Sequence, residues 1–364
     1  MTSKAAGTRD SGAPARLAAV LRAAAPADGV LLSDLADIRW TTGFTGSNAL
    51  VLVLDGRARL FTDARYQTQA AAEVSGAEVE ILSGSLLPSV AEKWLGNVSR
   101  LAVQSDRMPM ADAEALRARA PGVDLVPIAG LVSALRARKT TAEVQAIRAA
   151  QELTESVFAE ILDVIREGVT EREVAAEITY RHLRAGASAM SFDPIVAFGS
   201  NAALPHGRPT SRRLRRGDPV LIDMGCFLNG YASDMTRMLS FGAPSEDFRT
   251  VHGVVRDALH AARDAARSGM AASDLDRVAR DRIEAAGFGP QFGHSLGHGV
   301  GLEIHEAPSV SFRSDSPLPE HAVVTLEPGI YLPDRFGVRI EDIVHLLPDG
   351  CTRITELDTN LTIL

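Results

Sequence analysis

The sequence predicts two domains: an α/β domain, followed by a larger, strand-rich domain that also contains long helices. The chain has 364 residues, which is long enough to bury two separate hydrophobic cores. In the first part, short apolar strands alternate with helices, which is the pattern of an α/β domain. Beyond about residue 190 strands dominate, and helical segments interrupt them. Hydrophobic residues make up 46% of the chain and charged residues 23%, so a globular protein is expected.

The N-terminal domain is predicted to span residues 15–135, after a disordered tail at residues 1–14. Short apolar runs separated by turn residues such as Asp55-Gly56 indicate the strands of a buried sheet. Strands are expected at 30–32, 49–54, 59–61 and 101–103, and helices at 16–25, 64–74 and 89–95.

The second domain is predicted to span residues 136–364. Thr140 with Glu143, and Thr170 with Glu173, are capping-box pairs that mark the starts of two helices. The first of these helices is expected to run to about residue 165, before Gly168 stops it. Later strands are expected at 220–222, 238–240, 323–325 and 343–344, with helices at 247–268 and 273–286.

The charge balance argues against nucleic acid as a partner. The chain has 38 Lys and Arg residues against 46 Asp and Glu residues, a formal net charge of −8, whereas phosphate binding needs a basic surface. One local basic cluster is interpreted as a solvated loop before a strand. Its members are Arg212, Arg213, Arg215 and Arg216.

The sequence also predicts a cytoplasmic protein that makes no membrane contact. Its two cysteines, Cys226 and Cys351, provide neither a disulfide framework nor a cysteine-type zinc site. Arg16 and Arg22 interrupt the first Ala/Leu segment, so no signal peptide is expected. An apolar run of about 18 residues, the length needed for a transmembrane helix, is also lacking.

Two aspartates near a predicted hairpin are the first candidates for chemistry. Asp223 ends an apolar strand, where a buried carboxylate is costly unless a cation offsets it. Asp234 follows, and Asn229-Gly230 between them is a hairpin signal that would bring the two carboxylates together. Two like charges that close need a metal ion or a shared proton. The alternative is that Asp223 simply caps a turn at the end of its strand.

Three histidines set among glycines form the second candidate cluster: His294, His298 and His305. Glycines let a backbone approach an ion or substrate closely. The spacing differs from the His-Glu-x-x-His helix of zincins, so only one histidine need be a ligand. The others are then available for acid–base or oxyanion roles. The remaining isolated histidines are interpreted as surface or core residues: His182, His252, His260, His321 and His345.

Glu327 and Glu341 each follow apolar strand residues, again a costly position without a cation. For Glu341 a salt bridge to Arg339 is an alternative explanation. The three clusters together supply four carboxylates and one imidazole, which suit Mn²⁺ or Co²⁺ better than a structural zinc. Five ligands with several carboxylates fit a pair of ions, and paired ions generate a hydroxide nucleophile at neutral pH.

The order and context of these residues resemble the ligand set of the "pita-bread" metallopeptidases, which include methionine aminopeptidase, aminopeptidase P and prolidase. Residues 42–47 (TGFTGS) and 61–66 (FTDARY) are similar to the creatinase-like domain of the Xaa-Pro-cleaving branch, with Ala64 where glycine is usual. The resemblance implies an α/β creatinase-like N-terminal domain and an α+β pita-bread catalytic domain. It also implies two divalent metal ions, Mn²⁺ before Co²⁺ or Zn²⁺, held by Asp223, Asp234, His298, Glu327 and Glu341.

The resemblance also implies roles for the remaining candidates. Residues 204–207 (LPHG) are similar to the Xaa-Pro branch, in which the histidine, here His206, points into the active site. Glu327 would accept and return a proton besides binding metal. His206 and His305 would stabilise the tetrahedral oxyanion and the substrate, and His294 would line the proline pocket.

Arg339 has two expected roles: it orients Glu341 as an ion-pair partner, or it binds a substrate carboxylate. Methionine aminopeptidases generally lack the N-terminal domain, and creatinase lacks the metal ligands. This leaves the Xaa-Pro-cleaving branch, and the compact length of the chain favours an Xaa-Pro dipeptidase (prolidase), which is expected to be a homodimer. The first alternative is an Xaa-Pro aminopeptidase (aminopeptidase P) that acts on longer peptides. The second is a pseudo-peptidase that only binds, although such relatives typically lose ligands.

Overall fold

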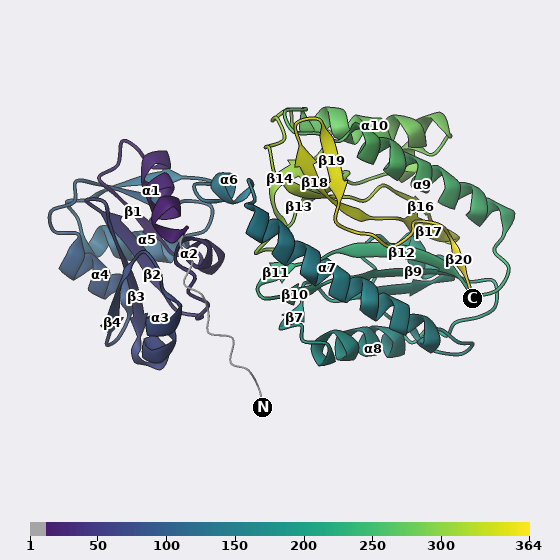
Figure 1. The fold of residues 1–364 in the computed structure, drawn as a ribbon, viewed down its shortest axis with the longest axis horizontal. Helices are drawn as coiled ribbons and strands as arrows, with labels where there is room; N and C mark the ends of the chain where they lie inside the picture. Colours follow the sequence, from purple (N-terminus) through teal and green to yellow (C-terminus); the bar gives the residue numbers. More distant parts are fainter. Residues whose placement is uncertain (1–11) are drawn as a thin grey trace. The chain divides into compact units, whose positions relative to one another are not determined.

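The computed structural model describes residues 12–364, which form two compact units that divide between Arg136 and Ala137 (Figure 1). Most of the predicted N-terminal tail lies outside the described residues. Its last residues do not continue the tail, because helix α1 (Ala13–Ala23) begins at Ala13 rather than at residue 16. Pro14 in the first turn favours this earlier start, since a proline there loses no hydrogen bond. No helix of the described residues is long and apolar enough to cross a membrane.

The first unit is built on one mixed six-stranded sheet with the order β4-β3-β2-β1-β5-β6. Strand β1 pairs antiparallel with β2 and parallel with β5. The strands are β1 Gly29–Leu32, β2 Leu50–Leu54, β3 Arg57–Asp63, β4 Glu78–Leu82, β5 Arg100–Gln104 and β6 Asp124–Ile128. The helices after α1 are α2 Leu35–Thr42, α3 Gln67–Glu73, α4 Leu86–Trp94, α5 Met110–Arg119 and α6 Ser133–Arg136.

The four predicted strands of this unit are confirmed as β1, β2, β3 and β5, and β4 and β6 were missed. The missed strands form the two edges of the sheet and are partly exposed, so their sequences mix charged with apolar residues. The two creatinase-like motifs lie against each other. Phe44 packs edge-on against Tyr66 with ring centroids 5.8 Å apart, and the Tyr66 hydroxyl lies 2.5 Å from Ser47 Oγ.

The second unit contains four long helices and four small sheets. The helices are α7 Thr141–Ile161, α8 Glu171–Arg184, α9 Glu246–Ala265 and α10 Ala272–Ala285. Both predicted capping boxes are confirmed, at Thr140 with Glu143 and at Thr170 with Glu173. In each box the threonine hydroxyl accepts from the glutamate backbone N–H, and the glutamate carboxylate accepts from the threonine backbone N–H.

The sheets of the second unit have the orders β20-β12-β9-β8, β14-β13-β15-β18-β19, β11-β10-β7 and β16-β17. The first seven strands are β7 Ala189–Met190, β8 Ile195–Phe198, β9 Pro219–Met224, β10 Cys226–Leu228, β11 Tyr231–Ala232, β12 Met235–Ser240 and β13 Gly297–Gly299. The rest are β14 Glu306–Val310, β15 Val323–Leu326, β16 Gly329–Leu332, β17 Phe336–Arg339, β18 Asp342–Leu347, β19 Gly350–Arg353 and β20 Thr362–Ile363.

The helices cover the strands from two sides, α7 and α8 from one and α9 and α10 from the other (Figure 1). The two faces of strand β9 pack against different helices. Val220, Ile222 and Met224 join the apolar cluster of α7 and α8, whereas Leu221 joins the cluster of α9 and α10. Because side chains alternate along a strand, Asp223 points to the same inner side as Leu221.

Arg237 of β12 ties three backbone segments together inside the second unit. It is 3% exposed, and its guanidinium forms an ion pair of 2.7 Å with Asp342. It also donates to the carbonyl oxygens of Glu341, Leu357 and Asp358 at 2.6, 2.7 and 2.9 Å. Asp342 also has longer ion pairs with Arg353 at 3.6 Å and Arg263 at 3.9 Å, but Arg237 is its closest partner. Removing one side of a buried charge pair is costly, because the other charge stays buried.

We expect Arg237→Met to destabilise the second unit by about 3 kcal/mol, since the buried Asp342 would lose its closest ion-pair partner and the Glu341 and Asp358 carbonyls would lose their donor. In differential scanning calorimetry of the full chain this should lower the Tm by about 6 °C or more. Arg256→Met is the control, because Arg256 pairs only at the surface, with Asp257 and Asn360. Equal Tm values for the two variants would contradict this role of Arg237.

Candidate metal centre

The five predicted metal ligands line one cavity of about 500 Å³ in the second unit. Each lies in or next to a strand: Asp223 in β9, Asp234 before β12, His298 in β13, Glu327 after β15 and Glu341 before β18. The Asn229-Gly230 turn has positive φ at both residues and closes the β10–β11 hairpin, as predicted. The antiparallel pairing of β9 with β12 then brings the two aspartates together.

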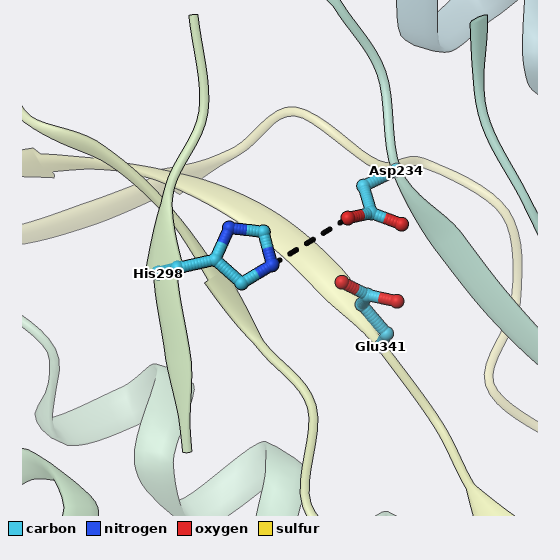
Figure 2. A group of neighbouring side chains, drawn as sticks. All are labelled: Asp234, His298 and Glu341. Carbon is cyan, nitrogen blue, oxygen red and sulfur yellow. Dashed lines mark ion pairs between the residues drawn. The ribbon is translucent and has the colours of Figure 1, made fainter. Parts of the chain in front are cut away.

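Asp234, His298 and Glu341 converge most closely, with one ligand atom from each within 4.8 Å of the others (Figure 2). His298 Nε2 lies 3.6 Å from an Asp234 oxygen and 3.5 Å from a Glu327 oxygen. His298 Nδ1 lies 3.1 Å from the Gly299 carbonyl, which can only accept, so Nδ1 carries the proton. Burial lowers the pKa of His298 to about 4, so the ring is neutral and Nε2 presents a lone pair.

The electrostatics of the cavity favour a bound cation. Burial, followed by repulsion from neighbouring carboxylates, raises the pKa values of Asp234 and Glu341 well above their usual range. Burial also raises the pKa of Glu327, to about 8. One oxygen each of Asp223 and Glu341 is buried and accepts no hydrogen bond from the described residues. A lone pair and orphaned carboxylate oxygens that face one another fit divalent cations, which would replace the missing partners.

Two threonines that the sequence analysis missed hold the ligands in place. Thr236 Oγ1 donates to Glu341 at 2.9 Å, and Thr325 Oγ1 lies 3.3 Å from Glu327 while accepting from the His298 backbone N–H at 3.0 Å. Both threonines are fully buried. Thr236 lies two residues after Asp234, and Thr325 lies two residues before Glu327, each on a strand. Residues two apart on a strand point to the same side, and this alternation was the signal that could have identified both threonines.

Arg339 pairs with Asp223 rather than with Glu341, so the predicted orientation of Glu341 by a direct ion pair is not what the structure contains. Its NH2 lies 2.5 Å from Asp223 Oδ2, and its NH1 donates to the Tyr331 hydroxyl at 2.8 Å and to the Pro205 carbonyl at 3.0 Å. Its Nε donates to Thr236 Oγ1 at 3.1 Å. Arg339 is 3% exposed, and these four contacts occupy most of its five N–H groups.

The three other predicted site histidines also line the cavity: His206, His294 and His305. His305 packs edge-on against His298 with ring centroids 4.3 Å apart. His294 Nδ1 donates to the Ser295 carbonyl at 2.8 Å, and its Nε2 lies 3.0 Å from the Tyr331 hydroxyl. Burial lowers the pKa of His294 to about 4, so this ring is neutral and offers mainly its faces to a ligand.

The histidines interpreted as core or surface residues lie outside this cavity. His182 and His252 are buried, and His182 Nδ1 donates to the Ile178 carbonyl at 2.9 Å. His321 and His345 stack on each other near the surface, 3.2 Å apart at their nearest nitrogens. The arginine cluster before β9 likewise lies in a loop, where Arg212 pairs with Asp218 at 3.2 Å.

The fold and the carboxylate-rich cavity define a metal-dependent hydrolase. Residues 145–347 match the model of metallopeptidase family M24, and residues 15–138 match that of the creatinase/prolidase N-terminal domain. The chain therefore belongs to metallopeptidase family M24. The predicted fold class, a creatinase-like domain followed by a pita-bread catalytic domain, is confirmed.

Relatives are similar over nearly the whole chain. The uncharacterized peptidase YqhT of Bacillus subtilis is 37% identical over 338 residues, 93% of this chain and 96% of its own. The structure of an Xaa-Pro dipeptidase from Bacillus anthracis superimposes with a TM-score of 0.93 at 36% identity and covers 97% and 100% of the two chains. An X-Pro aminopeptidase from Thermotoga maritima superimposes with a TM-score of 0.87 at 37% identity and covers 93% and 98%.

We expect metal removal to lower the Tm of the wild type, because a metal at 100 times its Kd stabilises the folded state by about 2.7 kcal/mol. Asp234→Asn should lose this metal-dependent gain. Without metal its Tm should equal or exceed that of the wild type, because one repelling charge is gone. Metal analysis and calorimetry with and without chelator check both points. Asp193→Asn is the control: Asp193 is a third aspartate of the same cavity that is not among the predicted ligands, and this variant should bind metal normally.

The metal-free protein should also become less stable as the pH rises from about 5 to 8. The folded pKa of Glu327, about 8, exceeds its ordinary value of 4.5, so over this range the unfolded chain releases a proton that the folded chain retains. The contribution of Glu327 to the free energy of unfolding is therefore fully present below pH 4.5 and is lost as the pH rises to about 8. Glu327→Gln should flatten the decline of the Tm, and a slope unchanged in that variant would count against this origin.

Proposed function

We propose that this chain is a dinuclear metal-dependent exopeptidase that hydrolyses the Xaa-Pro bond, with the activity of an Xaa-Pro dipeptidase (prolidase). The observation that carries the proposal is the convergence of all nine predicted site residues on one cavity. The structural relative from Bacillus anthracis, named an Xaa-Pro dipeptidase, supports the substrate class because its whole chain superimposes on this one.

In this proposal Asp223, Asp234, His298, Glu327 and Glu341 hold two divalent ions, with Mn²⁺ ahead of Co²⁺ or Zn²⁺. When bound, such a pair would act as a Lewis acid and lower the pKa of a water molecule toward neutrality. Oxygen-rich ligands with a single imidazole favour Mn²⁺ over a structural zinc. The neutral His298 supports the assignment, because its Nδ1–H is fixed by the Gly299 carbonyl and its Nε2 faces the carboxylates.

Glu327 is proposed to take the proton of the attacking water and return it to the leaving proline nitrogen. A raised pKa suits a carboxylate that must alternate between the two protonation states near neutral pH. His206 and His305 are proposed to donate to the oxygen of the scissile carbonyl as negative charge develops there. Both line the cavity, and His305 lies against the ligand His298.

His294 is proposed to pack against the proline ring. Both of its nitrogens are occupied by Ser295 and Tyr331, so the neutral ring offers an apolar surface that suits proline. Arg339 is proposed to position Asp223 and, through Thr236, Glu341, rather than to bind substrate. A tertiary proline amide resists general peptidases, which gives a dedicated enzyme its purpose.

An Xaa-Pro aminopeptidase that acts on longer peptides is the second candidate. The relative from Thermotoga maritima carries that name and is as similar in sequence as the dipeptidase, at 37% against 36% identity. A pseudo-peptidase is disfavoured, because all five ligand positions are retained and lie together. A homodimer and a cytoplasmic location stay predictions.

Hydrolysis of Ala-Pro beside Ala-Pro-Ala by the Mn²⁺-loaded protein tests the proposal. We expect the dipeptide to be cleaved preferentially, and Asp234→Ala to lose at least about a thousandfold in kcat/KM, because the carboxylate cluster loses a ligand. Asp193→Ala is the control for a change of charge in the same cavity. Preference for the tripeptide would favour the aminopeptidase, and cleavage of neither peptide would refute the Xaa-Pro assignment.

A further inference from the structure

Two arginines line the metal cavity, and they differ in what their guanidinium groups do. Arg339 is buried, and Asp223, Thr236, Tyr331 and the Pro205 carbonyl occupy its donors. Arg208 is exposed to the cavity, and within residues 12–364 its side chain has no hydrogen-bond or ion-pair partner. Its guanidinium N–H groups are therefore available to a ligand in the cavity.

The segment that carries Arg208 is held firmly at both ends. On one side the Pro205 carbonyl accepts from Arg339. On the other side the Thr210 backbone N–H and hydroxyl both donate to Glu171, at 2.8 and 2.5 Å. Glu171 is fully buried. Prolines at 205 and 209 restrict the backbone further, so contacts within the protein hold the loop around Arg208.

Arg208 lies two residues after His206, and both side chains line the cavity. In an Xaa-Pro dipeptide the terminal carboxylate lies about one residue length, roughly 3.5 Å, from the scissile carbonyl. A group that binds this carboxylate must therefore be a near neighbour of the group that binds the carbonyl oxygen. A guanidinium suits the task, because its parallel N–H groups match the two oxygens of a carboxylate.

We propose that Arg208 binds the terminal carboxylate of an Xaa-Pro dipeptide and so determines the preference for dipeptides over longer peptides. This inference rests on the proposed Xaa-Pro activity and assigns a residue to its specificity. A longer peptide carries an uncharged amide where the dipeptide has its carboxylate, so it gains nothing from the guanidinium. Arg208 touches substrate away from the reacting atoms and acts on binding rather than on the chemical step.

The test compares Ala-Pro, Ala-Pro-amide and Ala-Pro-Ala as substrates of the Mn²⁺-loaded full chain. Arg208→Gln should raise the KM for Ala-Pro about 10- to 100-fold, as expected for hydrogen bonds to a charged group, and should change kcat by less than about threefold. The KM values for the amide and for the tripeptide should move by less than about threefold. Arg208→Lys should recover part of the loss, because it keeps the charge without the planar fork.

Arg215→Gln is the matched control, an exposed arginine seven positions along the chain that does not line the cavity. Calorimetric binding of L-proline against L-prolinamide gives a readout without turnover, and Arg208→Gln should abolish the preference for proline. Equal losses for Ala-Pro and its amide, or unchanged KM values, would overturn the assignment while leaving the Xaa-Pro activity intact. A wild type that cleaves none of the three substrates would overturn the proposed function and this inference with it.

Discussion

The mutual repulsion of four clustered carboxylates, three of them buried and Glu327 partly exposed, is the constraint on which the second unit depends. Asp223, Asp234, Glu327 and Glu341 line one cavity, and burial and mutual repulsion raise the pKa values of the last three. A fold tolerates such a cluster only if the surrounding structure fixes each group and a cation completes it. Thr236, Thr325 and Arg339 fix three of these groups through contacts within the protein.

The strands explain how these groups reach one place from positions more than a hundred residues apart. Each predicted ligand lies in or directly beside a strand, where the pleat sets the direction of the side chain. The β9–β12 pairing places Asp223 opposite Thr236, and Thr236 then reaches Glu341. Arg237, the next residue of β12, holds the Glu341 carbonyl from the other side. The geometry of the candidate metal centre and the stability of the unit therefore depend on the same strand, β12.

The sequence was sufficient for the elements with strong local signals. The capping boxes at Thr140 and Thr170 and the Asn229-Gly230 turn are local chemistry, and each occurs as predicted. The five ligand positions could be proposed because carboxylates after apolar strands suggested a cation, and because their order together with His298 resembles the ligand set of the pita-bread metallopeptidases. The sequence could not predict which side chains that are distant in sequence contact one another in the fold. Arg339 looked like the neighbour of Glu341, two positions away, yet it binds Asp223, which is distant in sequence and adjacent in space.

Counting charges explains why one arginine of the cavity is buried and the other is free. With all four carboxylates ionised by bound metal they would carry −4, Arg339 would reduce this to −3, and two divalent ions would turn it into +1. A site with one positive charge in excess is suited to an oxyanion that develops beside it. Without Arg339 the same ions would exactly balance the carboxylates, and that preference would vanish. Arg339 is held by its contact with Asp223 and so is not available to bind a substrate carboxylate. Under our proposal, the substrate's own charge is recognised by a separate, exposed side chain, Arg208.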